Sequence, residues 1–123
     1  MELYREIVLE HFRDPRNQGH LDHPDRIGDA TNTTCGDKLT LELSLDTTGR
    51  VSAVAFDGQG CAISQASASL LTEEMKGKTL DELRAMDREC VFRLLGGPVS
   101  PGRENCALLI LHGRDKALNS PHA

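Results

Sequence analysis

The sequence predicts an α+β fold, in which a small antiparallel sheet of about three strands has helices packed on one face. Residues 38–46 alternate leucine with polar residues, which is typical of a half-buried strand. A short turn at 47–50 with a late glycine connects this strand to a second strand-like run at 51–57. The segments before and after this hairpin show helical spacing of apolar residues instead. We expect one domain over residues 1–123, because the chain is short.

The segment before the hairpin is expected to hold one helix and one weaker strand. Residues 2–13 place four side chains on one helical face: Tyr4, Ile7, Val8 and His11. Asp14 precedes a proline, which disfavours the helical conformation, so this helix should end there. Residues 27–34 are compatible with an edge strand, although their pattern is weak.

The segment after the hairpin is expected to be helical. Residues 62–75 are rich in serine and alanine, whose small side chains let a helix lie close to a sheet. Gly77 is a suitable residue to end that helix, and Thr79 with Glu82 forms a capping box that opens the next one. That helical pattern continues through 87–95, and a last helix is expected over 103–118.

Composition limits the classes of function. The chain has no tryptophan, one tyrosine and three phenylalanines, so the core must be aliphatic. The net charge of −5 and the lack of a basic run give no reason to expect a nucleic-acid partner. The sequence shows no apolar stretch of membrane-spanning length and no signal peptide, so we expect a cytoplasmic protein without a membrane partner.

Three cysteines and one aspartate form the most informative pattern. Gly36 separates Cys35 from Asp37 and lets the chain turn, so both side chains can point at one spot. Cys35 and Asp37 precede the first hairpin strand and Cys61 follows the second, so antiparallel pairing places them at the same edge of the sheet. Cys106 lies near the start of the last helix. If it meets the others, three sulfurs and one oxygen form a set of ligands for a soft or borderline metal.

The residues alone leave the role of these groups open. Cys61 and Cys106 lie near expected helix N-termini, which favour a thiolate, and a thiolate can either bind a metal or carry a persulfide. Asp37 is a more easily displaced ligand than sulfur, but an aspartate there can also simply cap its turn. Each cysteine can also be a small buried core residue, and we interpret Cys90 in this way.

The histidines are weaker candidates for a further ligand. His20 and His23 lie in an expected loop, and the sequence leaves both open. His11 is more easily explained by packing on the first helix, and His112 lies too far around its helix to share the face of Cys106. His122 lies in the C-terminal tail.

The chain resembles the NifU/IscU/SufU group of iron–sulfur cluster assembly proteins over nearly its whole length. Five segments in order carry the resemblance: Leu3–Gly19, Thr34–Asp37, Gly58–Ser64, Lys76–Lys78 and Cys106–Leu108. It implies a SufE/NifU-like α+β fold, with Cys35, Asp37, Cys61 and Cys106 around one site. It further implies that a cysteine desulfurase delivers sulfur there, and that a transient [2Fe-2S] cluster is built and passed to apo iron–sulfur proteins.

The sequence departs from the family pattern at three places. Asn105 stands where IscU proteins have a ligating histidine; SufU-type proteins also lack that histidine and bind zinc in the same pocket. Cys61 and Cys106 are nevertheless only 45 positions apart, which is the shorter IscU-like spacing. The IscU chaperone-recognition stretch is not matched at 97–103, and Arg103 replaces a lysine that could guide an anionic persulfide or simply face solvent.

Three hypotheses follow. In the first, a non-enzymatic scaffold holds a labile cluster, and Cys106 is the favoured persulfide acceptor. In the second, a zinc-dependent sulfurtransferase uses Cys35 as acceptor and stimulates a desulfurase. In the third, the chain is a small structural zinc domain. The sequence leaves the oligomeric state open.

Overall fold

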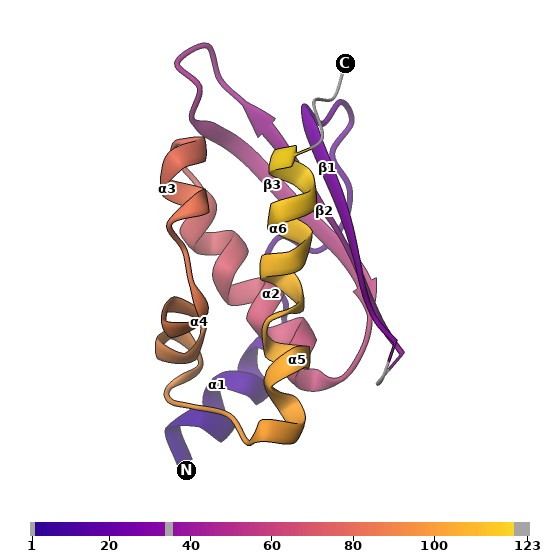
Figure 1. Ribbon diagram of the computed structural model, residues 1–123, viewed down its shortest axis with the longest axis vertical. Coiled ribbons are helices and arrows are strands. Elements are labelled where there is room, and N and C mark those ends of the chain that lie inside the picture. Colours follow the sequence, from indigo (N-terminus) through magenta and orange to yellow (C-terminus); the bar gives the residue numbers. More distant parts are fainter. Residues whose placement is uncertain (1, 34–35, 120–123) are drawn as a thin grey trace.

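A computed structural model describes residues 2–33 and 36–119, and the account below concerns these residues. Three antiparallel strands form one sheet, in which β2 (Asp37–Leu45) lies between β1 (Arg26–Asn32) and β3 (Val51–Gln59) (Figure 1). The α+β class and the three-stranded sheet predicted from the sequence are therefore confirmed. The weak strand predicted at 27–34 is the edge strand β1.

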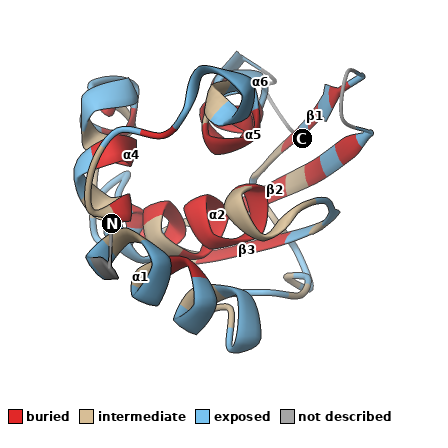
Figure 2. Cartoon of the chain, turned by 90° about the horizontal axis from the view of Figure 1, so that it is seen from below, coloured by how far each residue is buried: buried red, intermediate tan, exposed pale blue. Residues whose placement is uncertain are grey.

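Helices cover the sheet. Their bounds are α1 Glu2–Arg13, α2 Ala62–Met75, α3 Leu80–Arg84, α4 Arg88–Leu95, α5 Glu104–Ala107 and α6 Leu109–Asn119, with a 3₁₀ turn η1 at Pro101–Arg103. α6 packs on β1 and β2, α2 packs on β3, and α1 and α4 pack against α2 (Figures 1 and 2). The buried residues face inward between these helices and the strands, and the outer helix surfaces are exposed (Figure 2). Within the described residues, no helix combines the length and the apolar character needed to span a bilayer.

The leucines of β2 form the sheet side of the core. Leu39, Leu41 and Leu43 are at most 3% exposed, as the alternation predicts, and Leu45 is half-buried. The polar face of the same strand is not simply open to water, which is a correction, because Glu42 on that face is buried. The chain between α1 and β1 crosses this face and covers it.

His20 and Leu21 fasten this crossing segment to the sheet. The backbone N–H of Leu21 donates to Glu42 Oε1 at 2.7 Å, and His20 Nδ1 lies 3.0 Å from Glu42 Oε2. His20 Nε2 lies 3.2 Å from Asp57 Oδ2 on β3. The hydrogen bond to Glu42 and the charges of both carboxylates raise the pKa of His20, because they favour the protonated ring.

Glycine lets α6 lie unusually close to β1. A Cβ atom on Gly28 would fall on the backbone of α6, against Gly113 O and Ala117 N. Gly113 lies opposite, and a Cβ there would be 3.0 Å from Leu39 Cδ2. Because α5 leads directly into α6, this close contact also fixes where α5 lies relative to the sheet edge.

Two predicted helices are interrupted. The helical segment expected through 79–95 is two helices, because Asp87 caps a new one by accepting the N–H of Cys90 at 3.0 Å. The last helix, expected over 103–118, breaks at Leu108, whose φ and ψ of −94° and 0° are not helical. The capping box of Thr79 and Glu82 is present, and Gly77 has the expected positive φ of 80°.

A buried arginine joins the two halves of the helical layer. Arg114 on α6 is 7% exposed, and its guanidinium donates to Leu83 O at 2.6 Å and to Met86 O at 2.5 Å. These carbonyls lie at the end of α3 and in the link to α4. The arginine therefore satisfies backbone acceptors that the interruption of the helix leaves without helical partners.

Candidate functional site

Three described residues with metal-ligating side chains meet at one edge of the sheet. Asp37 is the first residue of β2, Cys61 immediately precedes α2, and Cys106 lies in α5. One ligand atom from each lies within 4.8 Å of the other two. The pairing of Lys38 with Gln59 explains why Asp37 and Cys61 lie together, since it places the start of β2 beside the end of β3.

The fourth predicted site residue, Cys35, lies outside the described residues, together with Thr34. The neighbouring backbone is described on both sides. Gly36 has a φ of 76°, which favours glycine, and its N–H donates to Asn32 O at 2.8 Å. This bond holds the end of β1 close to the start of β2, where Asp37 begins the strand.

The carboxylate of Asp37 is buried and only half satisfied. The residue is 2% exposed, and its Oδ1 accepts the backbone N–H of Cys61 at 3.3 Å. Its Oδ2 is buried without a hydrogen-bond partner among the residues that the structure describes. A buried carboxylate oxygen without a partner costs free energy, which a bound cation would offset. The oxygen and two sulfurs at this place fit a borderline metal such as zinc or iron.

The two sulfurs differ in access. Cys61 is half-buried and caps α2, a 14-residue helix whose N-terminal dipole favours a negative charge on the sulfur. Cys106 is fully buried, and Asn32 Nδ2 lies 3.9 Å from its Sγ. A reagent or partner that enters from solvent therefore meets Cys61 before Cys106.

Gly60 is required where Asp37 and Cys61 approach each other. A Cβ atom there would collide with Ser64 Oγ and lie 2.8 Å from Asp37 Oδ1. Ser64 Oγ in turn donates to Cys61 O at 3.0 Å. The glycine therefore leaves room for the carboxylate directly beside the first turn of α2.

Tyr4 and Arg103 lie near the sulfurs. Burial is the largest cause that raises the pKa of Tyr4, and the charges of Cys61 and Cys106 raise it further. Arg103 lowers the same pKa. The phenol is therefore within electrostatic range of both cysteines. Arg103 is exposed, as the solvent-facing interpretation of this residue expects.

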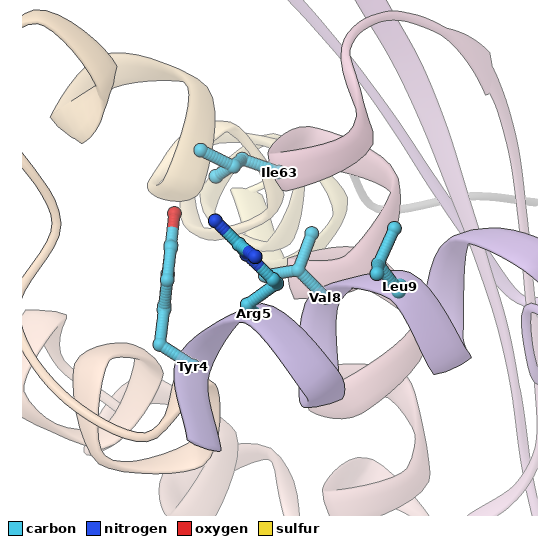
Figure 3. A pocket seen from close by; sticks show the side chains of 5 residues that line it. All are labelled: Tyr4, Arg5, Val8, Leu9 and Ile63. Atoms are coloured by element: carbon cyan, nitrogen blue, oxygen red, sulfur yellow. The ribbon is translucent and has the colours of Figure 1, made fainter. Parts of the chain in front are cut away.

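A groove of about 340 Å³ opens between α1 and the start of α2 (Figure 3). Its lining residues are Tyr4, Arg5, Val8, Leu9 and Ile63. Ile63 is two positions after Cys61, so the groove borders the accessible side of the site. The large apolar side chains that are most exposed in the described part of the chain also lie on α1: Leu3, Leu9 and Phe12.

The described histidines lie outside the group formed by Asp37, Cys61 and Cys106. His11 Nδ1 lies 2.7 Å from Ser69 Oγ on α2, and burial is the main cause that lowers its pKa. His20 pairs with Glu42 on the outer face of the sheet, and the carbonyl of His23 accepts from Ser44 there. His112 is exposed beside Asn105. His122 lies outside the described residues.

Cys90 also lies apart from the site. It is half-buried on α4 and packs against the core, which agrees with its interpretation as a core residue. Sequence reasoning did not connect Tyr4 or Asn32 with the cysteines. The one available signal was that Asn32 continues the inward positions of β1 with a polar residue, three places before Cys35.

Comparison with known proteins identifies the family. Residues 3–120 match the family described as the NifU-like N terminal domain. The chain is 40% identical over 86 residues to the zinc-dependent sulfurtransferase SufU of Bacillus subtilis, which covers 70% of this chain and 57% of that protein. It is 34% identical over 109 residues to the iron–sulfur cluster assembly scaffold protein IscU of Escherichia coli, covering 86% and 84% of the two chains.

A solved structure is also similar. It is the crystal structure of a candidate iron–sulfur cluster assembly scaffold protein for the SUF system from Fervidobacterium islandicum AW-1. The TM-score is 0.78 at 26% identity, over 96% of this chain and 98% of that one. The resemblance seen in the sequence is confirmed, and the chain belongs to the NifU-like N terminal domain family.

Proposed function

We propose that this protein is an iron–sulfur cluster assembly scaffold. It accepts sulfur from a cysteine desulfurase and holds a transient [2Fe-2S] cluster, which it passes to apo iron–sulfur proteins. The observation that carries the proposal is the buried Oδ2 of Asp37, which has no partner among the described residues and belongs to a group within 4.8 Å of two cysteine sulfurs. Membership of a family that contains scaffold proteins supports it.

The donor set suits temporary binding. We propose Cys35, Asp37, Cys61 and Cys106 as the ligands of the cluster. Thiolates are the usual ligands of iron–sulfur clusters, and a carboxylate oxygen among them is a harder and more easily displaced ligand. The hydrogen bond from the Cys61 N–H holds the carboxylate in place without using Oδ2. Asp37 is therefore the ligand that an acceptor thiol replaces most readily.

Sulfur arrives by persulfide exchange. A thiolate of the scaffold attacks the outer sulfur of a persulfide on the desulfurase, a new S–S bond forms on the scaffold, and the desulfurase leaves as a thiolate. We propose Cys35 and Cys106 as the final acceptors. Because Cys106 is fully buried, sulfur from the groove side first meets Cys61 and then passes to Cys106. Conversion of this sulfur to sulfide needs two electrons from a thiol or an electron-transfer protein.

A second function is a zinc-dependent sulfurtransferase in which Cys35 accepts the persulfide. The observation in its favour is that, in the described part of the chain, no histidine joins Asp37, Cys61 and Cys106. The 40% identity to a relative named as such a sulfurtransferase points the same way. The short spacing between Cys61 and Cys106 favours the scaffold.

One reconstitution experiment separates the two functions. Metal-free protein is incubated without oxygen with a cysteine desulfurase, cysteine, ferrous iron and equimolar zinc. Iron, acid-labile sulfide and zinc are then measured per chain. Iron and sulfide in equal amounts are expected for the scaffold. Retained zinc without sulfide, together with faster desulfurase turnover, would establish the sulfurtransferase instead.

Asp37→Ala tests the role of the oxygen ligand. We expect the variant to keep its cluster longer and to transfer it to an apo-ferredoxin more slowly, because the exchangeable position is lost. The decay of the visible cluster absorbance after addition of the apo-protein measures the rate. Asp22→Ala, at an exposed position away from the site, is the matched control. Transfer from Asp37→Ala at the wild-type rate would contradict the proposed role.

A further inference from the structure

Asn32 is a buried polar residue beside the buried sulfur of the site. It is 9% exposed, and its side-chain Nδ2 lies 3.9 Å from Cys106 Sγ. It ends β1, where the inward positions are otherwise Gly28 and Ala30. A polar side chain at an inward position requires a polar partner, and the Cys106 sulfur is one.

The backbone fixes the position of this amide. Asn32 pairs with Asp37 at the last position of the β1–β2 register, and its carbonyl accepts the N–H of Gly36 at 2.8 Å. The residue that contacts Cys106 is therefore held by the same turn that presents Asp37. Any shift of this turn would move the carboxylate and the amide together.

Asn32 also lines a polar pocket on the α6 side of the site. The pocket has a volume of about 220 Å³ and is lined by Thr31, Asn32, Thr33, Asn105, Leu109 and His112. Because Asn32 both lines this pocket and contacts the Cys106 sulfur, its side chain lies between the two. The groove beside Cys61 is on α1, so the pocket is a separate approach to the site.

We infer that Asn32 is a positioning residue for Cys106, which donates an N–H···S hydrogen bond to the sulfur and closes the pocket behind it. The hydrogen bond withdraws electron density from the sulfur when it ligates a metal, and such bonds help to set the properties of iron–sulfur centres. The closure leaves the Cys61 side as the route to the buried thiol. The effect on a bound metal rests on the proposed function, whereas the closure does not.

Two substitutions separate the hydrogen bond from the closure. Asn32→Asp keeps the volume of the side chain but removes the N–H donor. Asn32→Ala removes both the donor and the cover. Asn105→Asp and Asn105→Ala are the matched controls, because Asn105 lines the same pocket and is exposed. Circular dichroism establishes that each variant is folded.

The hydrogen bond is tested with cobalt(II) as the metal probe. A thiolate without its hydrogen bond gives up charge more easily, so the sulfur-to-cobalt absorption band should move to longer wavelength in both Asn32 variants. The Asn105 variants should keep the wild-type band. An unshifted band in both Asn32 variants would overturn the hydrogen bond. An equal shift in Asn105→Asp would overturn it too, because charge alone would then explain the change.

The closure is tested without metal. Metal-free protein is treated with iodoacetamide, and mass spectrometry of peptides gives the alkylation rate of each cysteine. We expect Cys106 to react at least several-fold faster in Asn32→Ala, and at a rate near wild type in Asn32→Asp and Asn105→Ala. No acceleration in Asn32→Ala would overturn the closure.

The two tests fail in distinguishable ways. If the wild-type protein binds no cobalt, the proposed metal site and the metal-dependent part of this inference are rejected together. The alkylation result still decides the closure in that case. If the wild-type protein binds cobalt and the Asn32 variants match it in both measurements, the inference about Asn32 is wrong and the proposed function stands.

Discussion

Gly60→Ala should damage the site while leaving the fold nearly intact. The added Cβ would collide with Ser64 Oγ and lie 2.8 Å from Asp37 Oδ1, where ordinary contacts begin at 3.4 Å. The carboxylate must therefore move by roughly 0.6 Å, which is enough to disturb a site that tolerates errors of about 0.5 Å. Gly60 does not have the positive φ that would strain an alanine, so the contacts alone account for the effect.

The expected magnitude follows from these contacts. Overpacking of this kind destabilises the metal-free protein by about 1–3 kcal/mol, and the lower end applies because the serine side chain can rotate. Displacement of a ligand or of its hydrogen-bond partner lowers metal affinity about 10- to 100-fold, which corresponds to roughly 1.4–2.7 kcal/mol. Metal binding should therefore be weakened by at least as much as folding.

The assay is a competition titration. Metal-free protein competes with a chromophoric chelator for zinc, and urea unfolding of the same protein gives its stability. Gly102→Ala is the control, because a Cβ there meets nothing within 4 Å. A zinc affinity of Gly60→Ala within twofold of the wild-type value, or an equal loss in Gly102→Ala, would refute the reasoning.

Three further predictions concern the frame around the site. Gly28→Ala should lower the free energy of unfolding by about 3 kcal/mol or more, since its Cβ meets the backbone of α6, which cannot rotate away; urea unfolding measures this. Arg114→Leu should cost about 2–4 kcal/mol in the same assay, because two buried carbonyls lose their donor, and Arg93→Leu at an exposed position should cost much less. The raised pKa of His20 implies a contribution to stability that is complete below the unfolded-state value near 6.5 and is lost as pH rises through the folded value. In His20→Gln, the slope of unfolding free energy against pH should therefore lose this component just above pH 6.5; an unchanged slope would count against the ion pairs.

The part of the site that a hairpin determines could be predicted from the sequence. The leucine alternation of β2 sets which face is buried, and the short turn sets the register with β3. Together they place Asp37 beside Cys61, because both follow from local pattern and antiparallel geometry. The position of Cys106 depends instead on how closely α6 packs on β1, and that distance depends on Gly28 meeting α6. No local pattern reveals such a contact.

Two other features depended on contacts between distant segments. Alternation predicts that Glu42 faces water, but it cannot show that the irregular segment carrying His20 crosses that face. Helical spacing runs through 79–95, but it cannot show that Asp87 caps a new helix or that Arg114 satisfies the carbonyls at the interruption. In each case a side chain far away in sequence or a competing cap decided the structure.

The core of the molecule separates the proposed function from a structural zinc domain. The buried apolar residues form one cluster that includes Leu41 on the sheet, Leu71 on α2 and Ile110 on α6, and the site lies at its edge. The metal-free chain therefore has a hydrophobic core that does not depend on the ligands, and it should remain folded after chelation. Metal binding adds stability by mass action, about 4 kcal/mol at a thousandfold excess over Kd, because the ligands come from separate elements. A structural zinc domain would instead unfold when the metal is removed, which circular dichroism before and after chelation distinguishes.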